Sequence, residues 1–210
     1  MLIIGDFHFL WECLRVLFVM FWGTPAQPGS LCNLREIIHR TQVDKSAKVF
    51  NTADELLMHT FRAHLLTSVT FLLHRDDESD TIIHESTGEW LRHQAEILVD
   101  QILFPKTIQD PVHMLHKSFL HHAFLYVDLR HAIRWEDGPQ IVRHWKWWIP
   151  RFIGTGKKMY AAEAVNMIAN LTADFPKHIA YLVTHNRTVN CVGKRGHGKP
   201  VDQLMEHYNL

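Results

Sequence analysis

The chain has 210 residues, which is long enough for a domain with a hydrophobic core. Of these residues 47% are hydrophobic and 21% are charged, and this composition excludes a disordered or low-complexity chain. Lysine and arginine together number 22, as do aspartate and glutamate, so the net charge is zero when histidine is neutral. A zero net charge excludes a protein covered all over with basic residues for nucleic acid, although a local basic patch is still allowed.

The first predicted element is a buried β-strand at Leu2–Ile4, followed by Gly5 and Asp6. The apolar run that comes next, residues 16–22, is far shorter than the roughly 20 residues that a membrane span needs. A signal peptide has basic residues before its apolar stretch, whereas this chain opens with Leu2-Ile3-Ile4-Gly5 and the acidic Asp6. We therefore expect an intracellular protein that is neither secreted nor anchored in a membrane. A core strand at the first residues also predicts that the chain begins inside a domain.

The remaining elements are predicted to be almost all helical. Hydrophobic periodicity and breaking residues predict helices at residues 9–21, 31–39, 53–73, 88–104, 111–133, 139–152, 157–173 and 176–185, and a terminal segment at 201–210. Ser30 and Thr52 stand where residues that cap helices are preferred, and Pro150 is expected to interrupt its helix. Residues 75–80 form an acidic, solvated loop. The predicted fold is mainly α, a bundle-like array of helices with one short N-terminal strand.

Asp6 is the most informative acidic residue, because it lies between the predicted strand and a helix. Metal-dependent phosphoryl-transfer enzymes place a carboxylate at such a position, and its hard oxygens suit Mg²⁺ or Mn²⁺. Glu163 is a natural second ligand, since the small alanines beside it allow a neighbouring element to approach closely. The pattern predicts that Asp6 and Glu163 are metal-binding catalytic residues. The alternatives are a helix cap for Asp6 and a surface position for Glu163.

Two other segments suggest contacts with nucleic acid. The tryptophans at 145, 147 and 148 could stack on bases, although such clusters more often pack between helices. The glycine-rich loop at residues 193–199 has three cations that could contact DNA phosphates, namely Lys194, Arg195 and Lys199. It lacks the spacing of a P-loop, and the alternative is a solvated basic loop without a ligand.

The C-terminal segment contains a motif of unknown role, made of Asp202, Glu206, His207 and Asn209. Asp202 and Glu206 are four residues apart, which places both carboxylates on one face of a helix. Together with His207 they form a third hypothesis, a zinc site. The three cysteines are far apart and form no CxxC pair, so a disulfide framework and a cysteine-rich zinc site are not indicated.

Several segments, taken in order, resemble one known family. They are Gly5-Asp6-Phe7-His8, Pro28–Leu31, Trp145-Lys146 with Pro150 and Phe152, Tyr160–Ala164, then Asn190, Gly193, Gly196, Pro200 and Asp202, and finally Met205–Asn209. This set resembles the domain-of-unknown-function family 6589, which is expanded in mushroom-forming fungi. The resemblance implies that residues 1–210 are a single domain, the C-terminal portion of a larger family domain. Met159 and Gly198 depart from the asparagines that are usual in the family.

The family has no settled activity, but its pattern is similar to the catalytic domain of ribonuclease-H-type transposases. There, three carboxylates hold two metal ions for attack on a phosphodiester. The analogy implies that Asp6 is the second acid and Glu163 the third, and that His8 orients Asp6 or contacts the phosphate. The N-terminal strand would then be the remnant of an α/β core. The protein would be a transposon-derived, metal-dependent nuclease that acts on DNA in the nucleus, and it would be inactive as this fragment.

A second hypothesis from a different class is a non-catalytic helical protein that binds a partner or serves as a scaffold. On this hypothesis Asp6 and Glu163 lie far apart, or one of them is buried in an unrelated salt bridge. The positions of these two carboxylates therefore distinguish the two hypotheses.

Overall fold

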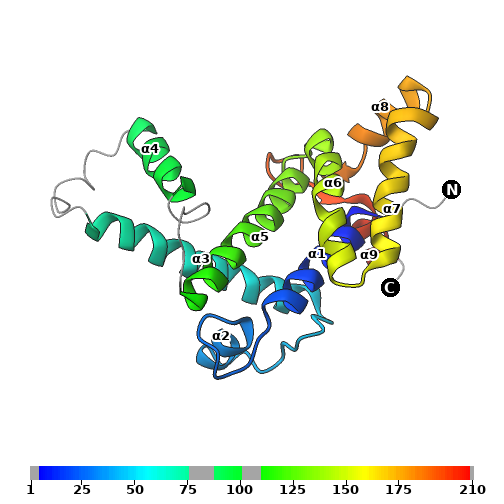
Figure 1. The fold of residues 1–210 in the computed structure, drawn as a ribbon. Coiled ribbons are helices and arrows are strands. Elements are labelled where there is room, and N and C mark those ends of the chain that lie inside the picture. Colours follow the sequence, from blue (N-terminus) through cyan, green and yellow to red (C-terminus); the bar gives the residue numbers. More distant parts are fainter. Residues whose placement is uncertain (1–4, 76–87, 101–109, 209–210) are drawn as a thin grey trace. The chain divides into compact units, whose positions relative to one another are not determined.

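The structure is a computed structural model that describes residues 5–75, 88–100 and 110–208 (Figure 1). Most of these residues are helical, which confirms the prediction of a mainly α fold. None of the helices in the described ranges has the length and hydropathy needed to cross a membrane. The predicted strand at 2–4, the acidic loop beyond residue 75 and Asn209 lie outside the described residues.

The elements follow one another in a simple order. The helices are α1 Asp6–Phe21, α2 Leu31–Ile37, α3 Phe50–Arg75, α4 Gly88–Leu98, α5 Pro111–Arg134, α6 Gly138–Gly154, α7 Lys158–Ala169, α8 Lys177–His185 and α9 Val201–Tyr208. A π-helical turn, η3, follows α7 at Asn170–Asp174. The strands β1 (Thr188–Val189) and β2 (Lys199–Pro200) form an antiparallel pair, with Thr188 opposite Pro200.

The chain divides into two compact units, with boundaries within α1, within α5 and on both sides of residues 45–47. The first unit contains residues 1–20, 45–47 and 124–210, and the second contains residues 21–44 and 48–123. Each unit has buried hydrophobic side chains of its own. The sequence-based assignment of residues 1–210 to a single domain within a larger one stays a prediction.

The core of the first unit is aromatic. The ring of Phe9 in α1 stacks on the ring of Trp145 in α6, with 4.1 Å between centroids and 7° between planes. Phe152, also in α6, meets Phe9 edge to face. Trp145, Trp148 and Phe152 are fully buried, and α6 packs along α7 (Figure 1). These contacts agree with the packing alternative for two of the three tryptophans.

The second unit contains the short helix α2, which begins as the sequence predicts. The Ser30 side chain accepts a hydrogen bond from the backbone N–H of Asn33, so Ser30 is the N-cap. Farther along, the ring of His64 in α3 stacks on the ring of His116 in α5, with centroids 4.2 Å apart. The Ser68 hydroxyl lies 3.2 Å from Nε2 of His116. Burial, and to a lesser degree the nearby His116, lower the pKa of His64 to about 4.

Three details of the sequence-based elements were wrong. Thr52 does not cap α3, because the helix already begins at Phe50 and the Thr52 hydroxyl donates to the carbonyl of Val49. Pro150 does not interrupt α6; Pro150 and Lys146 are both exposed, so water can bind the carbonyl that lacks a helical partner. The β1–β2 hairpin was not predicted, because strands of two residues are too short to show a period.

Gly138 permits the close approach of two helices in the first unit. A Cβ at this position would lie 1.8 Å from the backbone oxygen of Thr184 at the end of α8, whereas a Cβ at Gly154 would meet nothing within 4 Å. We expect Gly138→Ala to lower the free energy of unfolding by about 1–3 kcal/mol, because backbone atoms would have to move. Gly154→Ala is the matched control and should leave stability unchanged or slightly raised. Urea unfolding measures both, and equal effects would contradict the packing.

The stacked histidines make stability depend on pH. The folded pKa of His64 lies below its ordinary value of 6.5, at about 4, so the unfolded chain takes up a proton first as the pH falls. Stability is therefore full above pH 6.5 and is lost between pH 6.5 and about 4, by up to roughly 3 kcal/mol from this group. Burial also lowers the pKa of His116 and His144, which adds to the same trend.

Urea unfolding at a series of pH values checks this effect. The fall in stability should be shallower in His64→Phe, which keeps a ring in the stack but cannot be protonated. His59→Phe changes an exposed histidine of the same helix and should keep the wild-type slope. A His64→Phe protein with the full wild-type slope would show that His64 is not the group responsible.

Candidate functional site

Asp6 lies at the first turn of α1 and is held in a buried ion pair. The Arg187 guanidinium donates from Nε to Oδ2 at 2.8 Å and from Nη2 to Oδ1 at 2.6 Å. The indole Nε1 of Trp145 also donates to Oδ1, at 3.3 Å. The side chains of Asp6 and Arg187 are only 3% and 4% exposed. Both carboxylate oxygens therefore already accept hydrogen bonds from other side chains of the protein.

The surroundings of this pair explain its electrostatics. Burial raises the pKa of the Asp6 carboxyl, and the Arg187 guanidinium opposes that rise. Arg187 also lies over the ring of Trp145, 5.6 Å from the centroid, and its Nη1 is 3.9 Å from the sulfur of Met167 in α7. Arg187 thus joins α1, α6 and α7 at one buried point. Two charges buried together are stable only when they are paired and hydrogen bonded, as these are.

Asp202, a member of the motif of unknown role, caps α1 from a distance of 195 residues along the chain. Both its oxygens accept from the backbone N–H of Phe7 at 3.1 Å, and Oδ2 also accepts from the N–H of His8 at 3.2 Å. A carboxylate at this position satisfies N–H groups that have no helical partner and lies at the positive end of the helix dipole. Gly5 makes room for it, since a Cβ there would lie 2.0 Å from Oδ2.

His8 lies between two carboxylates of α9. Its Nδ1 is 3.1 Å from Oδ2 of Asp202, and its Nε2 is 3.2 Å from Oε1 of Glu206. The spacing of four residues places Asp202 and Glu206 on one face of α9, as predicted from the sequence, and that face contacts the first turn of α1. About half of the His8 side chain is exposed. His8 thus links α1 to α9, and both its ring nitrogens are used in doing so.

Glu163 lies on α7 and is half-buried. Within the part of the chain that the structure describes, no hydrogen bond or ion pair connects it to Asp6 or to any other side chain. Among the same residues, no group of three or more histidine, cysteine, aspartate or glutamate side chains is arranged to hold a metal ion. The Asp6 carboxylate does not fit Mg²⁺ or Mn²⁺ as it lies, because its oxygens already bind Arg187.

The other predicted site residues lie in two places. Lys194 and Arg195 are exposed on the loop between β1 and β2, and Lys199 is exposed at the start of β2. His207 lies in α9, and its part in a zinc site stays a prediction. Of the tryptophan cluster, Trp147 is 44% exposed while Trp145 and Trp148 are buried.

Arg187 is the residue that the sequence interpretation missed. The sequence indicates the role of Arg187 only weakly, because a single arginine before Thr188 is typical of an ordinary surface cation. An aspartate that is buried beside a long apolar segment does, however, need a partner of opposite charge. Searching for that cation would have left many possibilities, since arginine and lysine number 22 in this chain.

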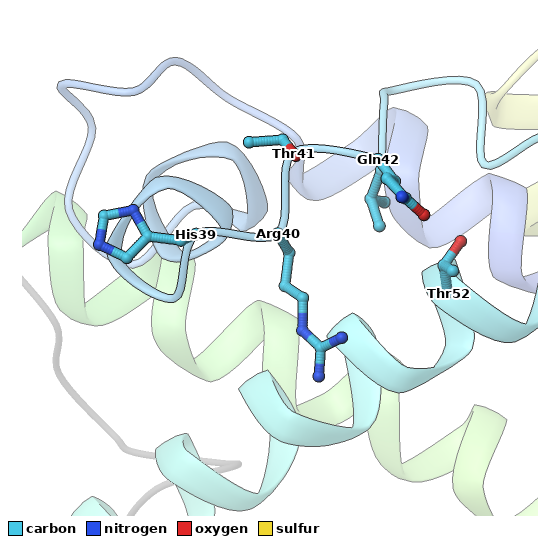
Figure 2. Close-up of a pocket in the computed structure, with 6 residues that line it drawn as sticks. His39, Arg40, Thr41, Gln42 and Thr52 are labelled. Carbon is cyan, nitrogen blue, oxygen red and sulfur yellow. The ribbon is translucent and has the colours of Figure 1, made fainter.

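A pocket of about 240 Å³ lies in the second unit, after α2 (Figure 2). It is lined by His39, Arg40, Thr41, Gln42, Val43 and Thr52. The guanidinium of Arg40 pairs with Glu55 at 2.6 Å, and the His39 ring points away from Gln42 and Thr52 in Figure 2. The lining is polar, but its one cationic group is already paired, so the pocket offers no evident set of catalytic groups.

Comparisons with known proteins identify a family without assigning an activity. The sequence model of DUF6589, described as a family of unknown function, matches residues 1–210, so the chain belongs to that family. No curated protein and no solved structure matches the chain significantly. Family membership is thus established by the sequence, while a transposase origin is not.

The cap made by Asp202 can be tested by truncation. We expect Asp202→Ala to lower the free energy of unfolding by about 1–2 kcal/mol, because two N–H groups of α1 lose their acceptor. Glu206→Ala is the matched control on the same face of α9. It removes only a half-exposed ion pair and should cost less than about 1 kcal/mol. Urea unfolding compares the two, and an equal or larger loss for Glu206→Ala would contradict the cap.

Proposed function

We propose that this member of the DUF6589 family is a non-catalytic helical binding module. On this proposal the acidic and histidine motif residues are structural. His8, Asp202 and Glu206 fasten α1 to α9, and Asp6 fastens α1 to Arg187. The surface that these contacts support binds a partner.

One observation supports it most directly, the buried pair between Asp6 and Arg187. A carboxylate that binds a divalent cation must offer at least one oxygen to the metal. Both oxygens of Asp6 accept from Arg187, and one also accepts from Trp145. If one Asp6 oxygen turned from Arg187 to a metal ion, the buried Arg187 charge would keep only part of its counter-charge. This loss costs free energy because both side chains are almost completely buried.

The rival is a transposon-derived nuclease in which Asp6 and Glu163 bind Mg²⁺ or Mn²⁺ and His8 orients Asp6. It requires Arg187 to leave the carboxylate and Glu163 to approach it. It also predicts cleavage of DNA and a nuclear location. The two proposals make opposite predictions for the same pair of variants, since one needs Asp6 for stability and the other needs it for metal binding.

The test is the stability of Asp6→Asn beside Glu163→Gln, each with and without millimolar Mg²⁺. We expect Asp6→Asn to lower the free energy of unfolding by about 3–5 kcal/mol, because it leaves Arg187 charged and buried without a counter-charge. Glu163→Gln should stay within about 0.5 kcal/mol of the wild type. Mg²⁺ should not change the melting temperature of the wild type, since a bound ion would raise it.

A double variant keeps the test informative if Asp6→Asn fails to fold. Asp6→Asn combined with Arg187→Met removes both charges and should recover much of the lost stability. The rival predicts the reverse pattern: Mg²⁺ stabilises the wild type, both single variants abolish that effect, and Asp6→Asn remains well folded. Observing that pattern would overturn the binding module.

A further inference from the structure

The loop between β1 and β2 has a defined conformation. Oδ1 of Asn190 accepts from the N–H groups of Val192 and Gly193, at 3.3 and 2.9 Å, and its Nδ2 donates to the carbonyl of Lys194 at 2.9 Å. Gly193 and Gly196 have φ angles of 68° and 77°, in the left-handed region that favours glycine. Asn190 and the glycines therefore determine the path of the loop.

The far side of this loop is fastened to the end of α5. The N–H of Gly198 donates to the carbonyl of Arg134 at 3.0 Å, and Nε of Arg134 donates to the carbonyl of Gly196 at 3.3 Å. The Arg195 guanidinium lies over the ring of Trp135, 4.7 Å from its centroid. A Cβ at Gly198 would lie 2.6 Å from the carbonyl of Ile133, so the loop and the helix end are in close contact.

The cations of this loop are exposed, and they form no ion pair with the described residues. Lys194, Arg195 and Lys199 are exposed, as is His197 between them. Within the described ranges of the chain, no carboxylate forms an ion pair with the three cations or with Arg134. Elsewhere in the first unit, cations such as Lys157 and Arg187 pair with glutamate or aspartate. The loop is therefore a local positive patch in a chain whose net charge is zero.

Nearby acidic residues do not neutralise the patch. Asp137 accepts from the N–H of Gln140 and so caps α6. Glu136 lies close to Gly198, because a Cβ added at Gly198 would be 2.7 Å from Cγ of Glu136. Glu136 forms no ion pair with a described residue. Lys194, Arg195, Lys199 and Arg134 thus outnumber the two carboxylates, Glu136 and Asp137.

We propose that the loop at residues 193–199, with Arg134 beside it, binds the phosphate groups of a nucleic-acid backbone. Lys194 and Arg195 are separated from Lys199 along the chain by Gly196, His197 and Gly198, and all three cations are exposed. Several exposed cations along one segment fit the repeated phosphates of a polymer better than a single small anion. The Arg195 guanidinium lies over the ring of Trp135, which is 43% exposed, and this contact positions the Arg195 side chain.

This inference rests on the binding role proposed above and supplies its ligand. Contacts to phosphates alone do not depend on the base sequence of the nucleic acid. The ligand is bound and not cleaved. One experiment therefore separates the two proposals. If the loop does not bind, the binding measurement fails; if the protein is catalytic, the oligonucleotide is cleaved.

The experiment measures binding of fluorescein-labelled single-stranded and duplex oligonucleotides to the 210-residue chain by fluorescence anisotropy, in a series of salt concentrations. The variant is Lys194→Gln/Arg195→Gln/Lys199→Gln. We expect it to weaken binding roughly tenfold or more and to reduce the slope of log affinity against log salt by about 2 to 3. The wild type and the variant should have the same melting temperature, since the three side chains are exposed.

The matched control is Lys45→Gln/Lys48→Gln/Arg62→Gln, which removes the same charge from three other exposed residues. It should bind as the wild type does. Equal weakening in both triple variants would overturn the loop site, as would no binding to either oligonucleotide or stronger binding to anionic phospholipid vesicles. Mg²⁺-dependent cleavage of the oligonucleotide by the wild type would instead overturn the non-catalytic function and leave the loop as a binding site.

Discussion

The ion pair between Asp6 and Arg187 is the interaction on which the first unit depends. Arg187 reaches α1 through Asp6, lies over Trp145 of α6 and contacts Met167 of α7. Its own carbonyl accepts from the N–H of Val201, where α9 begins. Because both charges are almost completely buried, neither can exchange its partner for water. The position of the segment after α8 is thereby determined.

That position in turn determines where α9 lies. The hairpin of β1 and β2 reverses the chain directly after Arg187, so α9 returns to the first turn of α1. Asp202 then caps that turn, and Glu206 contacts the far side of His8. The buried ion pair joins α1 to the segment before β1, and a more exposed group of polar contacts joins α1 to α9. The same hairpin holds the basic loop against the end of α5.

The role of an acidic residue depends on its neighbours. The sequence pattern predicts a metal site at Asp6 and Glu163, because a carboxylate between an apolar segment and a helix is typical of metal-dependent phosphoryl transfer, and that site stays a prediction. In the structure, Asp6 is paired with a cation that is distant in the sequence, and Asp202 acts on backbone N–H groups. A carboxylate serves equally well as a ligand, a cap or a counter-charge. Only its neighbours distinguish these roles, and they come from α6, α9 and the segment before β1.

The sequence by itself determined the family, the mainly α fold, the Ser30 cap and most helix positions, because hydrophobic period and capping preference are local properties. It also placed Asp202 and Glu206 on one helix face. Only the tertiary structure decided the start of α1 at Asp6, the partner of Asp6 and the continuation of α6 through Pro150. These features depend on contacts between residues up to 195 positions apart or on exposure to water, and a local sequence pattern predicts neither.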